Sequence, residues 1–213
     1  GVMLRSVNGA GTTSIEGHAG PQGVRCAYVG GNCLLAVFTL TGGGTLTAGD
    51  AITEQSGGGA WVADGGVVSN CVISANVAQQ YGGGVYGGIL NACRIHNNSA
   101  NNGGGACRSI SRNCLIRNNA AAEDGGGTYD GEYYYSTVVN NSAGPSGCGG
   151  VMNGPSVCSI VWANGAINFA NAVMNYCCTY PGPAGLWNIT NAPAFVDPDS
   201  DYRLTAASPC LDA

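Results

Sequence analysis

The chain has 213 residues and a net charge of −5, and only 9% of its residues are charged. Because it has no lysine and few arginines, it lacks the clustered basic side chains that a nucleic-acid-binding surface needs. No apolar run reaches the length of a membrane span, so the sequence predicts no transmembrane helix. The length is sufficient to bury a sizeable core in one domain.

Strand-like segments with imperfect spacing occupy residues 1 to about 56. The segment GVMLRSV (1–7) is strand-like from its first residues, with no signal peptide or capping segment before it. We therefore expect a mature or excised part of a longer protein, whose first coil is open or covered by another chain. An open coil exposes unpaired strand edges, which predicts end-to-end association. Cys26 and Cys33 are candidates for a disulfide that closes a small loop.

A six-residue phrase recurs between residues 57 and about 165. It reads CVISAN (71–76), CRIHNN (93–98), CLIRNN (114–119) and, more loosely, STVVNN (136–141). Its starts lie 22, 21 and 22 residues apart, and glycine runs near residues 82, 103, 125 and 147 keep the same period. This period is too short for two packed helices and is typical of one coil of a β-solenoid. The sequence therefore predicts stacked coils of about 21–22 residues.

Cysteine and isoleucine alternate with polar residues inside the phrase, a period of two residues. Cys71, Cys93 and Cys114 should therefore point inward and act as small buried apolar residues. Equivalent residues in successive coils lie about 5 Å apart, which is within disulfide range. Oxidation between coils is thus the alternative for these three thiols.

An asparagine ends each phrase, and these asparagines should stack at one corner of the coils. They are Asn76, Asn98, Asn119 and Asn141, with Asn164 as an extension of the row. Each amide offers two donors and an acceptor, so stacked amides can satisfy one another. Glycosylation is the alternative, because Asn97, Asn140 and Asn188 begin N-x-S/T sequons. The glycine runs mark a second corner, where positive φ and close contact between coils exclude a Cβ.

Charged residues near the glycine runs are the candidates for catalysis. Arg108 and Asp130 share a repeat position, and Asp124 directly precedes a glycine run. We interpret the first two as an exposed ion pair between coils, which contributes little to stability. The alternative is a polysaccharide lyase or glycoside hydrolase, in which these side chains would line a groove.

Tyrosines are the candidates for binding. Tyr86 and Tyr129 share a repeat position two coils apart, with Cys107 between them, and Tyr133 opens a run of three tyrosines. Exposed tyrosines on a rod can stack on sugar rings or contact another protein. Partial burial within the strands is the alternative.

The C-terminal part drifts out of the repeat and is rich in proline. We predict β-helix coils over residues 1–180 and a capping tail over 181–213, because an uncapped solenoid end exposes its core. The tail should fold over the last coil. A disulfide from Cys210 to either Cys177 or Cys178 would hold it there.

An acidic cluster in the tail is the only candidate metal site. Asp197, Asp199 and Asp201 have the spacing that begins a calcium loop. The glycine and the distal glutamate of such a loop are missing, so turn formation is the alternative. No C-x-x-C pair is present, and we expect no other cofactor.

Three segments carry a resemblance to a known family. They are RSVNGAGTTSIEG (5–17), VRCAYVGGNCLLAVFTLTGGG (24–44) and AFVDPDSDYRLTAASPCLDA (194–213). Together with the repeat, they resemble the right-handed parallel β-helix proteins of bacterial cell surfaces, including polymorphic outer-membrane and adhesin-like repeats. The resemblance covers nearly the whole chain and implies an all-β, right-handed parallel β-helix.

The same resemblance implies a secreted or cell-surface location in a bacterium. This fold carries adhesins, passengers, structural proteins and polysaccharide enzymes, so it does not by itself specify a function. We expect a non-enzymatic structural or adhesive rod. Its partners would be further copies of itself or a carbohydrate or other cell-surface ligand, and not nucleic acid. A carbohydrate-active β-helix is the alternative.

Overall fold

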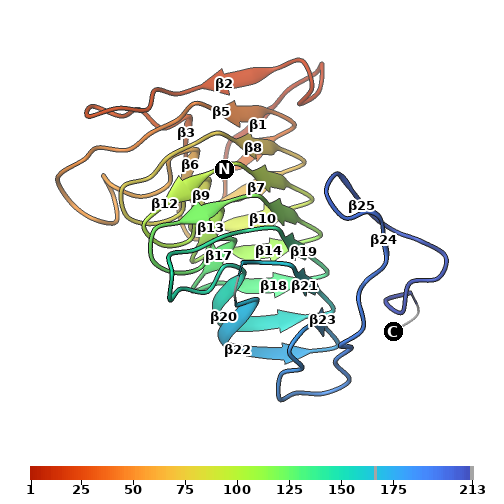
Figure 1. Ribbon diagram of the computed structural model, residues 1–213. Helices are drawn as coiled ribbons and strands as arrows, with labels where there is room; N and C mark the ends of the chain where they lie inside the picture. Colours follow the sequence, from red (N-terminus) through yellow and green to blue (C-terminus); the bar gives the residue numbers. More distant parts are fainter. Residues whose placement is uncertain (166, 212–213) are drawn as a thin grey trace.

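The computed structural model describes residues 1–165 and 167–211, and every regular element in them is a β-strand. Parallel strands stack into a β-solenoid of about eight turns (Figure 1). The predicted all-β parallel β-helix is therefore confirmed. No described segment forms an apolar helix long enough to cross a membrane.

Each complete turn contributes a short strand to each of three faces. The first face contains β1 (Met3–Arg5), β4 (Leu34–Ala36), β7 (Val67–Ser69), β10 (Ile89–Asn91), β14 (Ile110–Arg112), β18 (Glu132–Tyr134) and the second halves of β20 (Val151–Val157) and β22 (Phe169–Asn175). The second face contains β2 (Ser14–Glu16), β5 (Thr39–Thr41), β8 (Val72–Ser74), β11 (Arg94–His96), β15 (Leu115–Arg117), β19 (Thr137–Val139), β21 (Ile160–Trp162) and β23 (Cys178–Thr179). The third face contains β3 (Ala27–Val29), β6 (Ala60–Val62), β9 (Val85–Tyr86), β13 (Ala106–Cys107), β17 (Thr128–Tyr129) and the first halves of β20 and β22. The short strands β12 (Ser99–Ala100) and β16 (Ala120–Ala121) pair at the corner between the second and third faces.

In the three-residue strands of the first and second faces, the central residue points into the rod, as the alternation predicts. On the second face this gives a column of aliphatic side chains without solvent exposure: Leu40, Ile73, Ile95, Ile116, Val138 and Val161. The flanking residues of each strand point outward. Stacking of the coils therefore builds one continuous core along the rod.

The glycine runs lie where successive coils approach each other closely. A Cβ at Gly104 would lie 2.3 Å from the carbonyl oxygen of Ala120 in the next coil, and Gly103 has a φ of +66°. Both features confirm the predicted reason for glycine at this corner.

The asparagine corner is confirmed. All five predicted asparagines are buried. Each of the first four donates a hydrogen bond from its side-chain nitrogen to the side-chain oxygen of the next one along the rod, at 2.8–3.0 Å. That oxygen also accepts the backbone N–H of the preceding asparagine, as between Asn98 and Asn119 at 3.0 Å. The ladder therefore satisfies both the side chains and the turn.

The cysteine corner lies at the other end of the second-face strands. Cys71, Cys93 and Cys114 are buried there as free thiols, as the pattern predicts for small apolar residues. The same column continues through Ser136 and Ser159 to Cys177. Cys177 thus belongs to the core of the rod, which its sequence position near the tail had not indicated.

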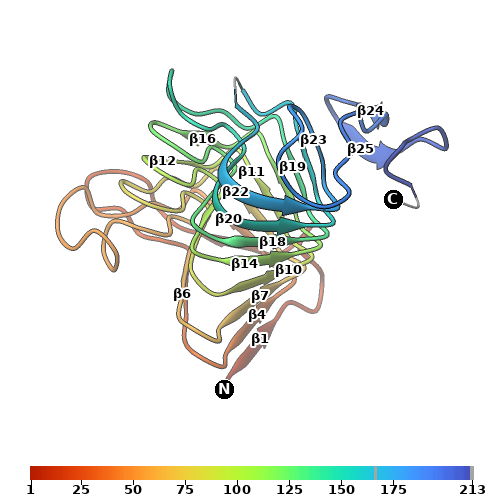
Figure 2. The ribbon, with the colours of Figure 1, turned by 90° about the horizontal axis from the view of Figure 1, so that it is seen from below.

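The C-terminal tail differs from the prediction. Its first part does lie along the last coil, since the N–H of Ile189 donates to the carbonyl oxygen of Cys177 at 2.8 Å. The antiparallel hairpin of β24 (Phe195–Asp197) and β25 (Asp201–Leu204) then turns back along the side of the rod, over the second face (Figure 2). Asn140 holds it there by donating to the carbonyl oxygen of Pro198 at 3.1 Å.

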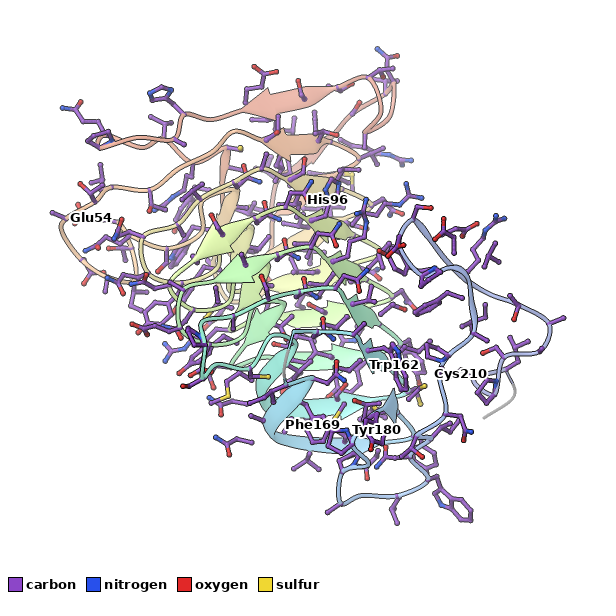
Figure 3. The ribbon with its side chains drawn as sticks, viewed as in Figure 1. Glu54, His96, Trp162, Phe169, Tyr180 and Cys210 are labelled. Carbon is purple, nitrogen blue, oxygen red and sulfur yellow. The ribbon has the colours of Figure 1, made fainter. Side chains whose placement is uncertain are left out.

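Burial and the neighbouring Cys210 thiol raise the pKa of Cys178. Cys210 lies on the tail beside the last coils (Figure 3), where Cys178 is its neighbouring thiol. All eleven cysteines are free thiols in the structure, so neither the tail disulfide nor the one between Cys26 and Cys33 is formed.

The first coil exposes apolar side chains. Val2 is 71% exposed and Met3 is 66% exposed, whereas the equivalent strands further along the rod are covered on both sides. End-to-end association through this surface stays a prediction.

Candidate functional site

A row of aromatic side chains runs along the outside of the third face, and we call it the aromatic row. Three of its rings come from residues that pair in register on adjacent strands, Tyr28 on β3, Trp61 on β6 and Tyr86 on β9. The inner residues of these strands, such as Ala60 and Val85, have no solvent exposure. The period of two therefore forces the aromatic residues outward.

The rings of the aromatic row stack along the rod axis. Tyr28 and Trp61 have ring centroids 5.1 Å apart and planes only 3° from parallel. Trp61 and Tyr86 follow at 6.2 Å and 21°. Such offset stacks stabilise each other beyond the apolar area that they bury. The row therefore presents a rigid aromatic surface.

Tyr81 continues the row where the strand residue is small. The register places Cys107 between Tyr86 and Tyr129, and a cysteine cannot fill the space of a ring. Tyr81 lies in the loop before β9. Its ring centroid is 6.5 Å from that of Tyr86 and 6.3 Å from that of Tyr129. The row thus spans five coils, from Tyr28 to Tyr129.

Exposure differs along the row. Tyr28 is 67% exposed, while Trp61 and Tyr129 are partly covered. Tyr86 is only 6% exposed, because the neighbouring rings cover it. Tyr86 is therefore not exposed as predicted, although it does belong to an aromatic cluster, and its role in binding stays a prediction.

Tyr133 is fully buried, so it too is not exposed as predicted. It is the central, inward residue of β18, and its neighbours in the same column are Ser111 and Ser156. The two small serines leave room for the large ring in the core. The repeat contained this information, because Tyr133 precedes Ser136 by three residues just as Leu90 precedes Cys93.

A polar cluster lies beside the aromatic row. The Arg108 side chain donates to the Asp130 carboxylate at 3.0 Å and to the Tyr86 hydroxyl at 3.1 Å. These partners stabilise the charged form and hold the pKa of Arg108 well above its usual value. Arg108 and Asp130 are both about half exposed, so the predicted exposed ion pair between coils is confirmed.

An open pocket of about 460 Å³ adjoins Trp61 and Tyr86. Ile52 also lines this pocket. The indole Nε1 of Trp61 holds the loop of Ile52 in place by donating to the Ile52 carbonyl oxygen at 3.0 Å. Asp64 and Arg108 add polar groups to its rim. An apolar wall with a few charged groups is typical of a small-ligand site.

Asp124 does not join this cluster. Its carboxylate accepts the backbone N–H of Cys148 at 2.9 Å, and its own N–H donates to the Asn102 side chain at 3.2 Å. It therefore fixes the glycine turn of the next coil. The structure brings together two of the three catalytic candidates and separates the third.

The three tail aspartates do not converge on a metal site. Asp197 accepts the backbone N–H of Asp199 at 2.9 Å, which is a turn interaction. Asp201 instead binds Arg203, whose Nε donates to it at 2.9 Å. No group of three metal-binding side chains occurs within residues 1–165 and 167–211. The turn-forming alternative accounts for Asp197, whereas Asp201 pairs with Arg203.

No family model, curated protein or solved structure matches this chain. The geometry of the site is therefore the basis for inferring its function. Sequence reasoning missed Tyr28, Trp61 and Tyr81. Trp61 follows Tyr28 by 33 residues instead of about 22, because an insertion forms the loop that carries Ile52. Aligning the glycine run at 57–59 with the later runs would have placed Trp61 in the same position as Tyr86.

Proposed function

We propose that this chain is a non-enzymatic adhesive rod of a secreted or surface-anchored bacterial protein, and that it binds carbohydrate through the aromatic row. The observation that carries the proposal is the stack of Tyr28, Trp61 and Tyr86 along the rod axis. Flat aromatic surfaces bind the apolar faces of sugar rings, and neighbouring polar groups bind the hydroxyls. A linear glycan would lie along the row.

The second candidate is a carbohydrate-active enzyme that uses Arg108 and Asp130 beside the same pocket. A lyase would require Arg108 to act as a base, yet two partners stabilise its protonated form. A hydrolase needs two carboxyl groups across a cleft, and Asp64 is the only carboxylate among the described residues that line this pocket. We therefore favour binding without turnover.

Calorimetric titration with neutral oligosaccharides, such as cellohexaose and chitohexaose, tests the proposal. Tyr28→Ala and Trp61→Ala should each weaken binding by roughly two- to tenfold, the effect of one aromatic contact. Trp187→Ala is the matched control, since Trp187 is 77% exposed on the tail and away from the row. Binding that these row variants leave unchanged would refute the proposal.

Product analysis separates the two candidates. If incubation with polysaccharides releases reducing ends or unsaturated products, and Asp130→Asn abolishes that release, the enzyme reading replaces the adhesive one.

A further inference from the structure

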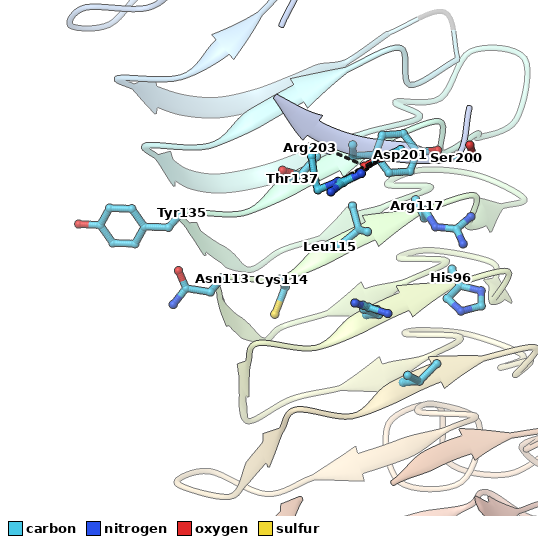
Figure 4. Close-up of a pocket in the computed structure, with 13 residues that line it drawn as sticks. His96, Asn113, Cys114, Leu115, Arg117, Tyr135, Thr137, Ser200, Asp201 and Arg203 are labelled. Carbon is cyan, nitrogen blue, oxygen red and sulfur yellow. Dashed lines mark hydrogen bonds and ion pairs between the residues drawn. The ribbon is translucent and has the colours of Figure 1, made fainter. Parts of the chain in front are cut away.

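A second hollow lies between the second face of the rod and the C-terminal hairpin (Figure 4). Its volume is about 620 Å³. The floor carries Arg94 and His96 from β11 and Arg117 from β15, and one wall carries Tyr202 and Arg203 from β25. We call it the arginine groove. It exists because the hairpin folds along the rod and not over its end.

Positive charge is concentrated in the arginine groove although the whole chain is acidic. Three of the seven arginines line it, on a chain of net charge −5. Among the described residues that line it, Asp201 is the only acidic one, and Arg203 neutralises this carboxylate. Arg94 and Arg117 form no ion pair with any described residue. Two guanidinium groups are therefore left uncompensated on its floor.

The register places these two arginines diagonally on neighbouring strands. Arg94 pairs with Leu115, and His96 pairs with Arg117. Strand geometry then puts their Cα atoms roughly 8 Å apart, with both side chains on the outer surface. Burial and both neighbouring arginines lower the pKa of His96, so the imidazole is neutral at pH 7. An anion between the guanidinium groups would relieve their repulsion.

We propose that the arginine groove binds an acidic oligosaccharide, through carboxylate or sulfate groups held by Arg94 and Arg117. Guanidinium groups form paired hydrogen bonds with such anions. Tyr135, which is 64% exposed, and Tyr202 add aromatic surface for the sugar rings. The floor extends across β8, β11, β15 and β19, so the groove follows the rod axis and accommodates a linear chain. This site is independent of the aromatic row.

A nucleic acid fits this groove less well. Its affinity depends on neutralising several successive phosphates, and only two uncompensated arginines are present. An acidic glycan can carry one anionic group on each disaccharide and still use both arginines.

Fluorescence anisotropy with labelled probes tests the inference. The carboxylate probe is an oligogalacturonate, the sulfate probe is a heparin-derived hexasaccharide, and maltohexaose is the neutral control. At least one acidic probe should bind, and added salt should weaken that binding. The double variant R94Q/R117Q should bind it roughly tenfold more weakly.

Two further variants sharpen the test. Arg112→Gln removes the same charge from the first face, where Arg112 lies over the ring of Tyr134, and should leave affinity unchanged. Asp201→Asn removes the only carboxylate and releases Arg203, so it should strengthen binding. Tyr28→Ala should have no effect, which separates this site from the aromatic row.

The inference fails if R94Q/R117Q and R112Q bind the acidic probe equally well, or if neither acidic probe binds. It also fails if oligothymidylate or inorganic phosphate competes as strongly as the acidic glycans. Circular dichroism establishes that each variant is folded. If the double variant unfolds, Asp201→Asn tests the inference instead. Stronger binding of the acidic probe by Asp201→Asn supports the inference, and unchanged or weaker binding refutes it.

Discussion

The asparagine corner and the cysteine corner close the same strands of the second face, yet they depend on different chemistry. At the asparagine corner every coil uses the same residue, and each amide bonds to the next. At the cysteine corner the residue changes from cysteine to serine and back to cysteine, as in Cys114, Ser136 and Cys177. The two corners close the same strands, but only the asparagine corner requires one residue type in every coil.

The difference follows from how many hydrogen bonds each corner requires. Asn119 binds the Ile95 carbonyl oxygen and the Asn141 side chain, and its own oxygen accepts two bonds from Asn98. The thiol of Cys114 is a weak donor, 3.3 Å from the Arg112 carbonyl oxygen in its own turn and 3.7 Å from the Leu90 carbonyl oxygen in the preceding coil. Of these two side chains, the amide alone forms hydrogen bonds to both neighbouring coils. We expect the two corners to respond very differently to substitution.

The largest effect should come from Asn119→Ala. It removes the partners of the Asn98 backbone N–H and of the Ile95 carbonyl oxygen, and both atoms are buried. Each buried group left without a partner costs about 1–3 kcal/mol, so we expect a loss on the order of 3 kcal/mol. The midpoint of urea unfolding measures this loss.

Asn118→Ala is the matched control for this prediction. Asn118 has a φ of +52°, but alanine already occupies the equivalent place at Ala75 and Ala163 with similar φ values of +57° and +53°. The substitution should cost less than about 1 kcal/mol. If both variants lose the same stability, the ladder has no special role.

The regular coils could be predicted from the sequence because identical residues recur at identical places. The Asn–Asn contacts follow directly from a 22-residue period, as does the pairing of Arg108 with Asp130. Tyr133 was misassigned because its serine neighbours in the column break the pattern of aliphatic residues.

The surface sites could be predicted only in part. Trp61 is displaced from the repeat by an insertion, so its stacking on Tyr28 was not visible in the sequence. The arginine groove depends on where a nonrepeating hairpin docks. That docking rests on a few contacts, such as Asn140 to Pro198, which have no counterpart in other coils. The repeat period of the sequence therefore does not predict where the hairpin docks.

The second prediction concerns alkaline pH, to which the two corners should respond differently. Burial raises the pKa of Cys71 to about 11, whereas an unfolded thiol has a pKa of about 8.5. Above the lower value the unfolded chain loses a proton that the folded chain retains. The thiol's contribution to stability is therefore complete below about pH 8.5 and declines as pH rises towards 11. Asparagine has no titrating group and contributes no such change.

Urea unfolding at several pH values between about 7.5 and 9 measures this decline, in a window that ends about one pH unit below the pKa of unfolded tyrosine. Cys71→Ser should reduce the slope of stability against pH. The explanation is wrong if stability stays constant across this window, or if Cys71→Ser leaves the slope unchanged.

The smallest effect should come from Cys114→Ser. Serine already serves this corner at Ser136, whose hydroxyl donates to the Tyr134 carbonyl oxygen at 2.9 Å and accepts the N–H of Cys114 at 3.2 Å. A serine at position 114 can form the same bonds, to the Arg112 carbonyl oxygen and from the Cys93 N–H. These bonds offset the lost apolar surface, so the free energy of unfolding should change by less than about 1 kcal/mol. Measured beside Asn119→Ala under the same conditions, a loss of equal size would show that both corners constrain the fold equally.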